Sequence, residues 1–295
     1  MKTLIVIGGA TASGKTAVAI ETALYFNTCI LSADSRQCYR ELNIGVAKPD
    51  IGQLKAVQHF FINSHSVHEE VSAGVYGRYG LEKLALIFEQ SDFAVCAGGT
   101  GLYIKALCEG LDVMPSIDKS IDQYINEQYL LHGLGWLQQQ VQQHDPLFAP
   151  SAEFHNPNRL LRALVFKLST GESILQFRTN QKQTRNFDIR YFALDAERTK
   201  LYQRIDQRVD EMVAQGLVAE AAQLHPLRHL KPLQTVGYTE LFDYFEGKLD
   251  LSLAIGKIKQ HSRNYAKRQI TWFKHQSDYI FVPPTCENII QALGY

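Results

Sequence analysis

A glycine-rich loop near the N-terminus carries the residue types that hold a polyphosphate. The loop follows an apolar run at 4–7, leads into an alanine-rich helical pattern and reads G-x-x-x-x-G-K-T. Its members are Gly9, Ala10, Thr11, Ala12, Ser13, Gly14, Lys15 and Thr16. Backbone N–H groups in such a loop point at phosphate oxygens, and the positive end of the following helix strengthens the attraction. We expect Lys15 to reach the outer phosphate and the Thr16 hydroxyl to ligate Mg²⁺. The motif leaves open which polyphosphate binds and whether a phosphoryl bond breaks.

Two polar residues follow the next predicted strands. Asp34 comes after an apolar run at 29–31, and Thr100 lies among three glycines after the run at 93–97. Ligands of open α/β sheets bind outside the carboxyl ends of the strands, so Asp34 should face whatever the loop holds. The glycines around Thr100 indicate a backbone that approaches a ligand closely. Asp34 is a candidate general base, a candidate Mg²⁺ ligand through water, or the cap of the next helix. Thr100 is a candidate phosphate ligand or part of an ordinary strand-to-helix turn.

Positively charged side chains gather in two predicted helices nearer the C-terminus. Arg204 and Arg208 share a helix face, which suits an anionic leaving group or pairing with the acids at 206, 210 and 211. No acidic residue lies between 250 and 278, whereas basic residues there are Lys257, Lys259, Arg263, Lys267, Arg268 and Lys274. Aromatic residues are interleaved with them, which indicates a nucleic-acid surface. We expect at least one of Tyr265 and Trp272 to be buried.

The order of elements predicts an α/β fold. Strand and helix patterns alternate to about residue 112, which indicates a parallel sheet with crossover helices. Residues 117–185 show no strand of the buried type. After them we expect a strand at 191–194, a helix at 198–224 that Gly216 interrupts, a helix at 251–275 and a short strand near 281. We therefore predict a P-loop NTPase-like parallel sheet with flanking helices and an inserted all-helical domain. The expected boundaries are 1–115 and 190–295 for the core and 116–189 for the insertion.

Composition limits the remaining possibilities. The 295 residues include 30 basic and 30 acidic side chains, so a nucleic-acid surface must be a local patch. Five cysteines without a C-x-x-C pattern favour reduced thiols in a cytoplasmic protein and disfavour zinc, as does the spacing of His59, His65 and His68. No apolar stretch approaches membrane-spanning length, so no membrane partner is expected. A monomer is the default expectation.

These segments, in this order, resemble the tRNA dimethylallyltransferase family in its shorter bacterial form. The matching stretches cover nearly the whole chain, at 9–16, 32–37, 43–49, 72–74, 98–103, 156–162, 204–208, 236–238 and 265–273. The glycine loop alone is unspecific. Its combination with Asp-Ser-Arg-Gln at 34–37, Gly-Gly-Thr-Gly-Leu-Tyr at 98–103 and Ala-Lys-Arg-Gln-Ile-Thr-Trp-Phe at 266–273 is highly specific.

The resemblance implies a prenyl transfer. Dimethylallyl diphosphate would donate its five-carbon group to N6 of the adenosine immediately 3′ of a tRNA anticodon, with diphosphate leaving and Mg²⁺ assisting. Asp34 would take the N6 proton, while the loop, Thr100 and Arg208, with Arg204 as a lesser helper, would stabilise the departing diphosphate. The adenosine would leave its stack and enter a channel opposite the donor.

The resemblance also implies a tRNA-binding surface. The insertion would clasp the anticodon stem-loop. The residues expected to contact tRNA are Asp34, Ser35, Arg36, Gln37, Thr100, Asn158, Arg159, Leu160, Leu161, Arg162, Gln234, Thr235, Val236, Gly237, Tyr238, Thr239, Lys267 and Arg268. Asp122 stands where the family usually has an Arg, which puts one contact in question, and Lys119 is close by.

Three other functions share part of this pattern. A small-molecule or nucleotide kinase would use the same loop, but many such kinases end the third strand in an Asp that holds Mg²⁺, and here that strand ends in glycine. Transfer of the prenyl group to free adenine nucleotides would not require the insertion or the basic helix. A GTP-dependent switch would require an Asn-Lys-x-Asp guanine reader, which the sequence lacks. Release of diphosphate, rather than ADP or GDP, distinguishes prenyl transfer from the kinase and the GTP-dependent switch.

Overall fold

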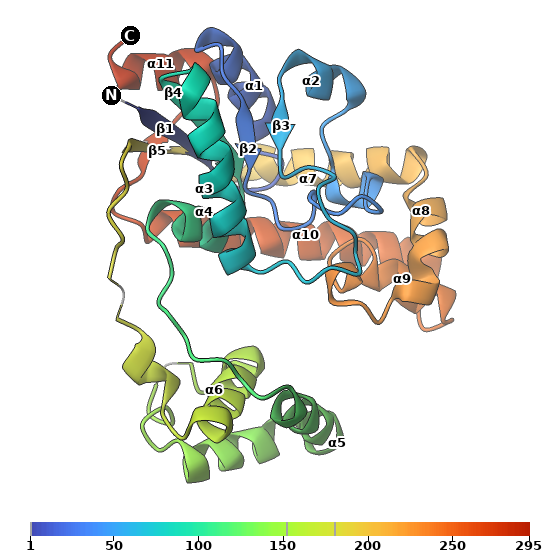
Figure 1. Ribbon diagram of the computed structural model, residues 1–295. Helices are drawn as coiled ribbons and strands as arrows, with labels where there is room; N and C mark the ends of the chain where they lie inside the picture. Colours follow the sequence, from blue (N-terminus) through green and yellow to red (C-terminus); the bar gives the residue numbers. More distant parts are fainter. Residues whose placement is uncertain (1, 152, 180) are drawn as a thin grey trace. The chain divides into compact units, whose positions relative to one another are not determined.

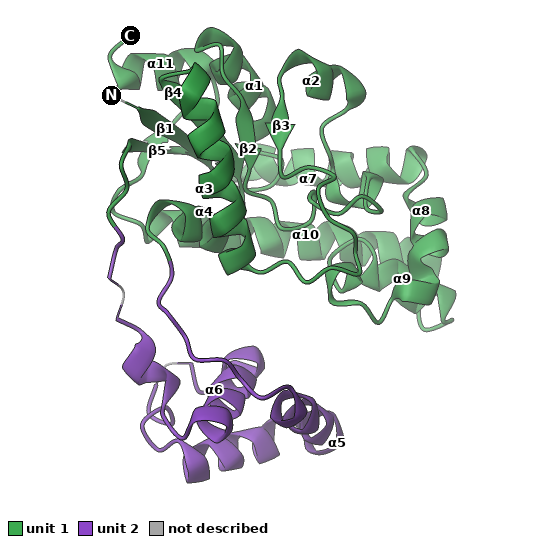
Figure 2. Ribbon diagram, viewed as in Figure 1, with its two compact units in different colours: residues 1–110, 184–295 green, residues 111–183 purple. Residues whose placement is uncertain are grey.

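The chain folds into two compact units. The structure is a computed structural model that describes residues 2–151, 153–179 and 181–295. Unit 1 comprises residues 1–110 and 184–295, and unit 2 comprises residues 111–183 (Figure 2). The boundaries expected from the sequence, 115/116 and 189/190, lie five and six residues further along the chain.

A parallel β-sheet forms the centre of unit 1 (Figure 1). Among the described residues its strands are β1 (Thr3–Gly8), β2 (Ile30–Ser32), β3 (His59–Phe60), β4 (Phe93–Gly98), β5 (Asp188–Leu194) and β6 (Ile280–Val282). Their order is β3-β2-β4-β1-β5-β6, and every neighbouring pair is parallel. The predicted α/β class is confirmed. The sequence pattern missed β3, which has two half-buried residues.

Helices cover both faces of this sheet. Ile5 and Ile7 of β1 pack in one cluster with residues of α1 (Lys15–Tyr25) and α11 (Cys286–Leu293). On the opposite face, the Tyr76 hydroxyl of α3 (Ala73–Gln90) lies 3.5 Å from the Cys96 sulfur of β4, and α4 (Gly101–Cys108) packs against α3. Residues 4–7 are fully buried. A strand covered on both sides reads as a continuous apolar run, which is why this one was visible in the sequence.

The C-terminal half of unit 1 adds a helical layer beside the sheet. It contains α7 (Arg198–Ala214), α8 (Leu217–Leu224), α9 (Thr239–Phe245) and α10 (Leu251–Lys274), while α2 (Ile51–Ala56) lies earlier in the chain. Short 3-10 turns occur at η1 (Ile44–Val46), η3 (His225–Leu227) and η4 (Lys231–Leu233). Gly216 separates α7 from α8 with a φ of 104°, as its predicted interruption of this helix required.

The expected burial of Tyr265 or Trp272 is wrong. Tyr265 is 38% exposed and Trp272 is partly exposed, whereas Phe273 is buried. Phe273 is buried because Gly8 leaves room for it: a Cβ on Gly8 would stand 2.3 Å from the Phe273 ring. The missing side chain at the end of β1 makes room for Phe273, so this residue anchors α10 against the sheet.

Unit 2 is helical and has its own core. It contains α5 (Lys119–His144), which is kinked at Gly133, α6 (Pro157–Thr170) and the turn η2 (Ile174–Phe177). No strand occurs among its described residues. Its buried residues include Ile125, Leu137, Val141, Phe148, Leu160 and Phe166. No helix in the described parts of the whole chain combines the length and the apolar character that a membrane crossing requires.

Candidate active site

The glycine-rich loop joins β1 to α1 at the carboxyl edge of the sheet. Gly14 precedes α1 with a φ of 94°, a left-handed conformation that glycine adopts without strain. The first-turn N–H groups of a helix have no intrahelical acceptor, so this end of α1 offers donors to an anion. Ser13 is 1% exposed, and its hydroxyl has no hydrogen-bond partner among the residues that the structure describes. The loop therefore holds a buried polar group that a phosphate oxygen would satisfy.

Lys15 lies at the first position of α1 and folds back over the loop. Its Nζ donates a hydrogen bond to the Ala10 carbonyl. Burial, followed by the positive charge of Arg208, lowers the pKa of Lys15 to about 7, against the opposing effect of Asp34. A buried ammonium with a cationic neighbour lacks compensating negative charge. A bound anion would supply that charge.

Asp34 lies just after β2 and organises the turn that follows. Its Oδ1 accepts the backbone N–H groups of Arg36, at 2.8 Å, and Gln37, at 3.2 Å. The predicted cap of a helix is wrong in detail, because residues 35–38 form a turn instead of a helix. A carboxylate that accepts two nearby N–H groups makes such a turn by itself. The same carboxylate lines the cavity of the glycine loop.

Thr100 links the ends of two neighbouring strands. Its Oγ1 accepts the Ser35 N–H at 3.1 Å, and its own N–H donates to the Ala33 carbonyl at 3.1 Å. Thr100 also precedes α4 directly. The two sequence interpretations of Thr100 are therefore not exclusive, because it belongs to a strand-to-helix turn and also fixes the loop that carries Asp34.

Arg208 of α7 faces the glycine loop, and its Nη1 lies 3.4 Å from the Thr11 hydroxyl. Burial lowers its pKa, and the charge of Glu211 opposes this effect. Arg204, one turn earlier, is exposed. The acids at 206 and 210 pair with the α10 residues Arg263 and Lys259. Arg208 therefore contacts the glycine loop, whereas the exposed Arg204 does not line its cavity.

Two cavities meet beside Asp34. The first, of about 290 Å³, is lined by the loop from 11 to 17, the end of β4 and Gln269. The second, of about 240 Å³, is lined by residues 34–36, the turn at 45–47, one face of α7 and residues 235–237. We call their common boundary the neck. The residues that line both cavities are Thr11, Asp34, Val46, Ala47, Arg208 and Tyr265.

Several residues expected to contact tRNA line the second cavity. Ser35, Arg36, Thr235, Val236 and Gly237 come together there from segments about 200 positions apart. Gln37 instead lines the first cavity and donates to the carbonyls of residues 46 and 47, at 3.2 and 2.9 Å. The neighbouring Gln234 is exposed and Thr239 is partly buried.

Other expected contacts belong to the protein interior. Tyr238 is fully buried, and its hydroxyl donates to Glu220 at 2.6 Å. Leu160 is fully buried in the core of unit 2. Neither side chain reaches the surface, so a tRNA contact at either position would have to come from the backbone. Each holds its segment in place instead.

The remaining expected residues of unit 2 lie on or near the first turn of α6. Asn158, Arg159 and Arg162 are exposed and Leu161 is partly buried. Arg159 pairs with Glu153. Asp122, at the position where an Arg was expected, lies in the first turn of α5 and accepts the Asn126 side-chain amide at 2.9 Å.

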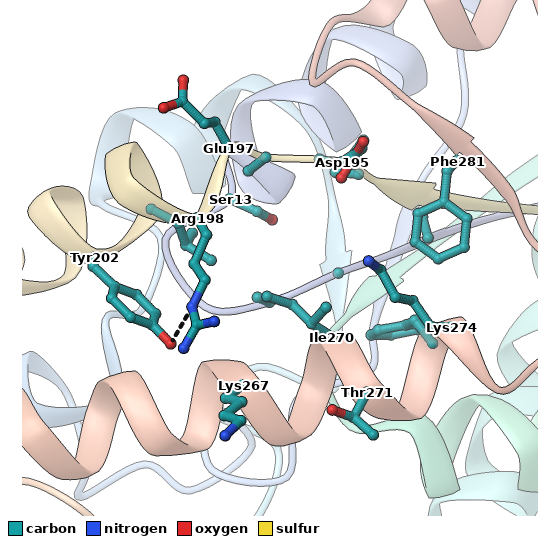
Figure 3. A pocket seen from close by; sticks show the side chains of 17 residues that line it. Ser13, Asp195, Glu197, Arg198, Tyr202, Lys267, Ile270, Thr271, Lys274 and Phe281 are labelled. Carbon is teal, nitrogen blue, oxygen red and sulfur yellow. Dashed lines mark hydrogen bonds between the residues drawn. The ribbon is translucent and has the colours of Figure 1, made fainter.

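Lys267 and Arg268 lie on different sides of α10. The Arg268 guanidinium lies 5.6 Å from the centre of the Tyr265 ring, which lines the neck. Lys267 instead lines a separate cavity of about 460 Å³ between the back of the glycine loop, the end of β5 and α10 (Figure 3). Arg268 is thus the better placed of the two for a ligand in the neck.

Metal-binding side chains are sparse. The described residues contain no group of three or more His, Cys, Asp or Glu side chains that would hold a metal ion. Thr16 and Asp34 do line the same cavity as the loop. Such a set of hard oxygen donors fits Mg²⁺, which proteins often bind through one or two side chains together with phosphate oxygens and water.

The sequence interpretation missed three parts of this site. Gln269 and Tyr265 of α10 reach the first cavity, and the turn at 45–47 forms a wall of both. All three lie in segments that carried the family resemblance, at 265–273 and 43–49. That signal marked the segments without indicating which side chains point inward.

A glycine-rich loop of the phosphate-binding type at the carboxyl edge of a parallel sheet, with a second cavity beyond a carboxylate, is the arrangement of a P-loop protein with space for a second ligand. The IPP transferase family model matches residues 37–276. The tRNA dimethylallyltransferase of Christiangramia forsetii is 44% identical over 271 residues, which cover 92% of this chain and 90% of that protein. The chain therefore belongs to the tRNA dimethylallyltransferase family and is a prenyltransferase.

Solved structures agree with this assignment. The tRNA isopentenylpyrophosphate transferase of Bacillus halodurans is 29% identical, with a TM-score of 0.73 over 100% of this chain and 95% of that chain. A eukaryotic dimethylallyltransferase acting on tRNA has a TM-score of 0.80 at 23% identity, over 99% of this chain and 78% of that chain, which supports the fold. The P-loop NTPase-like fold predicted from the sequence is confirmed.

Proposed function

We propose that the protein transfers a dimethylallyl group from dimethylallyl diphosphate to N6 of the adenosine immediately 3′ of the anticodon in tRNA. The C–O bond to the diphosphate breaks, its electron pair leaves with the diphosphate, and a bond from N6 to the same carbon forms. The observation that carries the proposal is the neck. It joins an anion-binding cavity to a second cavity at a single carboxylate, Asp34.

The first cavity suits the departing diphosphate. Loop N–H groups, Lys15 and Arg208 surround it with donors and positive charge. Positive charge placed in advance where negative charge develops lowers the barrier without reorganisation. Thr16 would hold Mg²⁺ here, and this ion would supply further positive charge to the leaving group.

The second cavity suits the acceptor base. Ile205, Val209, Met212 and Ile258 give it an apolar side, and residues 235–237 give it backbone groups. A base must leave its stack to enter such a cavity. Arg36, which is partly buried, lines this cavity, and exposed Arg268 lies beside Tyr265. Unit 2 offers the exposed residues Asn158, Arg159 and Arg162 as further tRNA contacts. Binding of the anticodon stem-loop by unit 2 remains part of the proposal.

Asp34 is the base in this proposal. Adenine N6 is a poor nucleophile because its lone pair is delocalised into the ring, so removal of its proton as the N–C bond forms assists the reaction. The two turn bonds engage Oδ1, and Oδ2 is the oxygen to which we assign the proton. General base catalysis of this kind contributes about 10²- to 10⁴-fold.

The first test is the transfer itself. Radiolabelled dimethylallyl diphosphate is offered with Mg²⁺ to unmodified tRNA, with AMP and ADP as parallel acceptors. We expect label in tRNA that is lost when the adenosine beside the anticodon is changed. Label in AMP or ADP would instead identify a nucleotide prenyltransferase, and absence of label in every acceptor would contradict the proposal.

The Asp34→Asn variant separates catalysis from turn formation. The Asn oxygen accepts the same two backbone N–H groups, so the turn persists, but the amide cannot take a proton. We expect turnover to fall by about 10²- to 10⁴-fold while the Kd for tRNA stays within about threefold. Asp34→Ala removes both functions and serves as the comparison. Activity retained by Asp34→Asn but lost by Asp34→Ala would reduce Asp34 to a structural residue.

A further inference from the structure

Gln269 is a neutral polar side chain buried beneath the two glycine loops of the site. It lies on α10 and is 7% exposed. A buried amide costs free energy unless its donor and its acceptor are both paired, so such a residue requires an explanation. The reaction proposed above does not use Gln269 directly.

Its amide connects the two loops. The side-chain oxygen accepts the Thr11 N–H at 2.8 Å, and the side-chain nitrogen donates to the Gly99 carbonyl at 3.0 Å. Because Thr11 presents a donor and Gly99 an acceptor, the partners fix the orientation of the amide. A Cβ on Gly99 would stand 2.1 Å from the Gln269 nitrogen, so glycine at this position admits the amide.

Each loop carries part of the proposed chemistry. Thr11 lies within the phosphate-binding loop and contacts Arg208. Gly99 directly precedes Thr100, which fixes the Asp34 loop through Ser35. The amide of Gln269 is therefore a bridge between the part of the site that holds the diphosphate and the part that holds the base.

We propose that Gln269 is a positioning residue that sets the distance between the phosphate-binding loop and the Asp34–Thr100 side of the neck. This inference rests on the proposed function. Reacting groups must be held within fractions of an ångström, and a displacement of about 1 Å costs about 100-fold in rate. Only a side chain with one donor and one acceptor at this spacing can bridge an N–H and a carbonyl at once.

Three substitutions test the bridge. Gln269→Glu keeps an acceptor for Thr11 but places an oxygen against the Gly99 carbonyl. Gln269→Met keeps the length and removes both bonds, and Gln269→Asn keeps the amide on a shorter stem. For Gln269→Glu and Gln269→Met we expect kcat to fall by about 10- to 100-fold and KM for dimethylallyl diphosphate to rise several-fold, with the Kd for tRNA unchanged. We expect Gln269→Asn to recover part of the loss.

The control is a second glutamine on the same helix. Gln260 is exposed on α10, so Gln260→Glu and Gln260→Met should leave both constants unchanged. Thermal unfolding and a single-turnover count of active sites correct for any loss of folded protein. Binding of inorganic pyrophosphate with Mg²⁺, measured by calorimetry, gives a readout that does not require turnover, and we expect it to weaken in Gln269→Met.

Two outcomes would overturn the inference. One is wild-type kcat and KM per active site in Gln269→Glu. The other is a fall in activity that matches the loss of folded protein, with KM and pyrophosphate affinity unchanged. If the wild-type protein transfers no label to tRNA, the proposed function fails instead, and pyrophosphate binding by the Gln269 variants still tests the bridge.

Discussion

At the scale of single residues, Lys15 makes the phosphate-binding loop sensitive to pH. Its pKa of about 7, which burial and Arg208 lower, means that Lys15 of the free protein loses its proton above neutrality. A bound diphosphate favours the ammonium form and raises the pKa again. Binding above pH 7 must then take up a proton, so affinity falls as pH rises through 7.

Between pH 8 and 9 we expect the Kd for pyrophosphate to increase with pH. The slope should approach about tenfold per pH unit, which is the limit for uptake of one proton. Calorimetry in two buffers of different ionisation enthalpy measures the proton uptake. Lys15→Arg is the matched control, because a guanidinium stays charged throughout this range. Identical pH slopes for wild type and Lys15→Arg would assign the effect to the ligand alone.

The residues of the site differ in how visible they were in the sequence. Lys15, Asp34 and Thr100 could be proposed because each follows a predicted strand, and parallel strands bring their carboxyl ends to one edge. Gln269 could not, because its role depends on which face of α10 meets the loops. The burial of Leu160 and Tyr238 was not visible either, because a motif indicates that a segment matters without indicating which side chains are buried.

At the scale of elements, the ends of β2 and β4 are held in close contact. Ala33 N–H donates to the Ala97 carbonyl at 2.7 Å, and a Cβ added to Gly98 would stand 2.2 Å from the Ala33 carbonyl oxygen. Backbone atoms cannot move aside as a flexible side chain does. The spacing of the two strand ends, and hence of Asp34 and Thr100, therefore depends on the absence of a side chain at Gly98.

Gly98→Ala should be destabilising, by about 1–3 kcal/mol, which is the usual cost of forcing extra atoms into a packed interior. Gly135→Ala is the control. No atom lies within 4 Å of a Cβ at this position in α5, so the better helix propensity of alanine should stabilise the helix by up to about 1 kcal/mol. Denaturant midpoints measure both, and an unchanged midpoint for Gly98→Ala would show that β2 and β4 can separate without cost.

Element length decided which parts of the fold the sequence revealed. The patterns at 4–7, 93–97 and 251–275 correspond to β1, β4 and α10, each long enough for its apolar run or its helical periodicity to show. The two-residue β3 and the short helices α2, α9 and α11 escaped, because about two turns carry little pattern. The two cavities could not be predicted, since four or more distant segments line each of them.

At the scale of the whole molecule, the two units have separate cores. The clusters around Ile5 and Leu201 belong to unit 1, and the cluster around Leu137 belongs to unit 2. Separate cores unfold separately unless an interface couples them. The chain also has two tryptophans, Trp136 in unit 2 and Trp272 in unit 1, so each unit carries its own fluorescent reporter.

Thermal unfolding followed by fluorescence should therefore show two transitions. In Trp136→Phe the remaining signal reports unit 1, and in Trp272→Phe it reports unit 2. Pyrophosphate with Mg²⁺ should raise the unfolding midpoint of unit 1 alone. At a concentration of 100 times its Kd, the ligand should add about 2.7 kcal/mol to the free energy of unfolding of this unit. A single transition, or an equal shift of both reporters, would mean that the two units fold as one cooperative body.

The neck has a consequence for the timing of the catalytic cycle. A site with one mouth must admit and discharge its substrates in turn, and each occupant blocks the next. Cavities on both sides of Asp34 and Arg208 would give the two substrates of the proposed reaction separate places to bind. In the proposed reaction, the acceptor would fill one side, and diphosphate would depart and a fresh donor enter by the other. In that reaction, release of one product would not block binding of the other substrate.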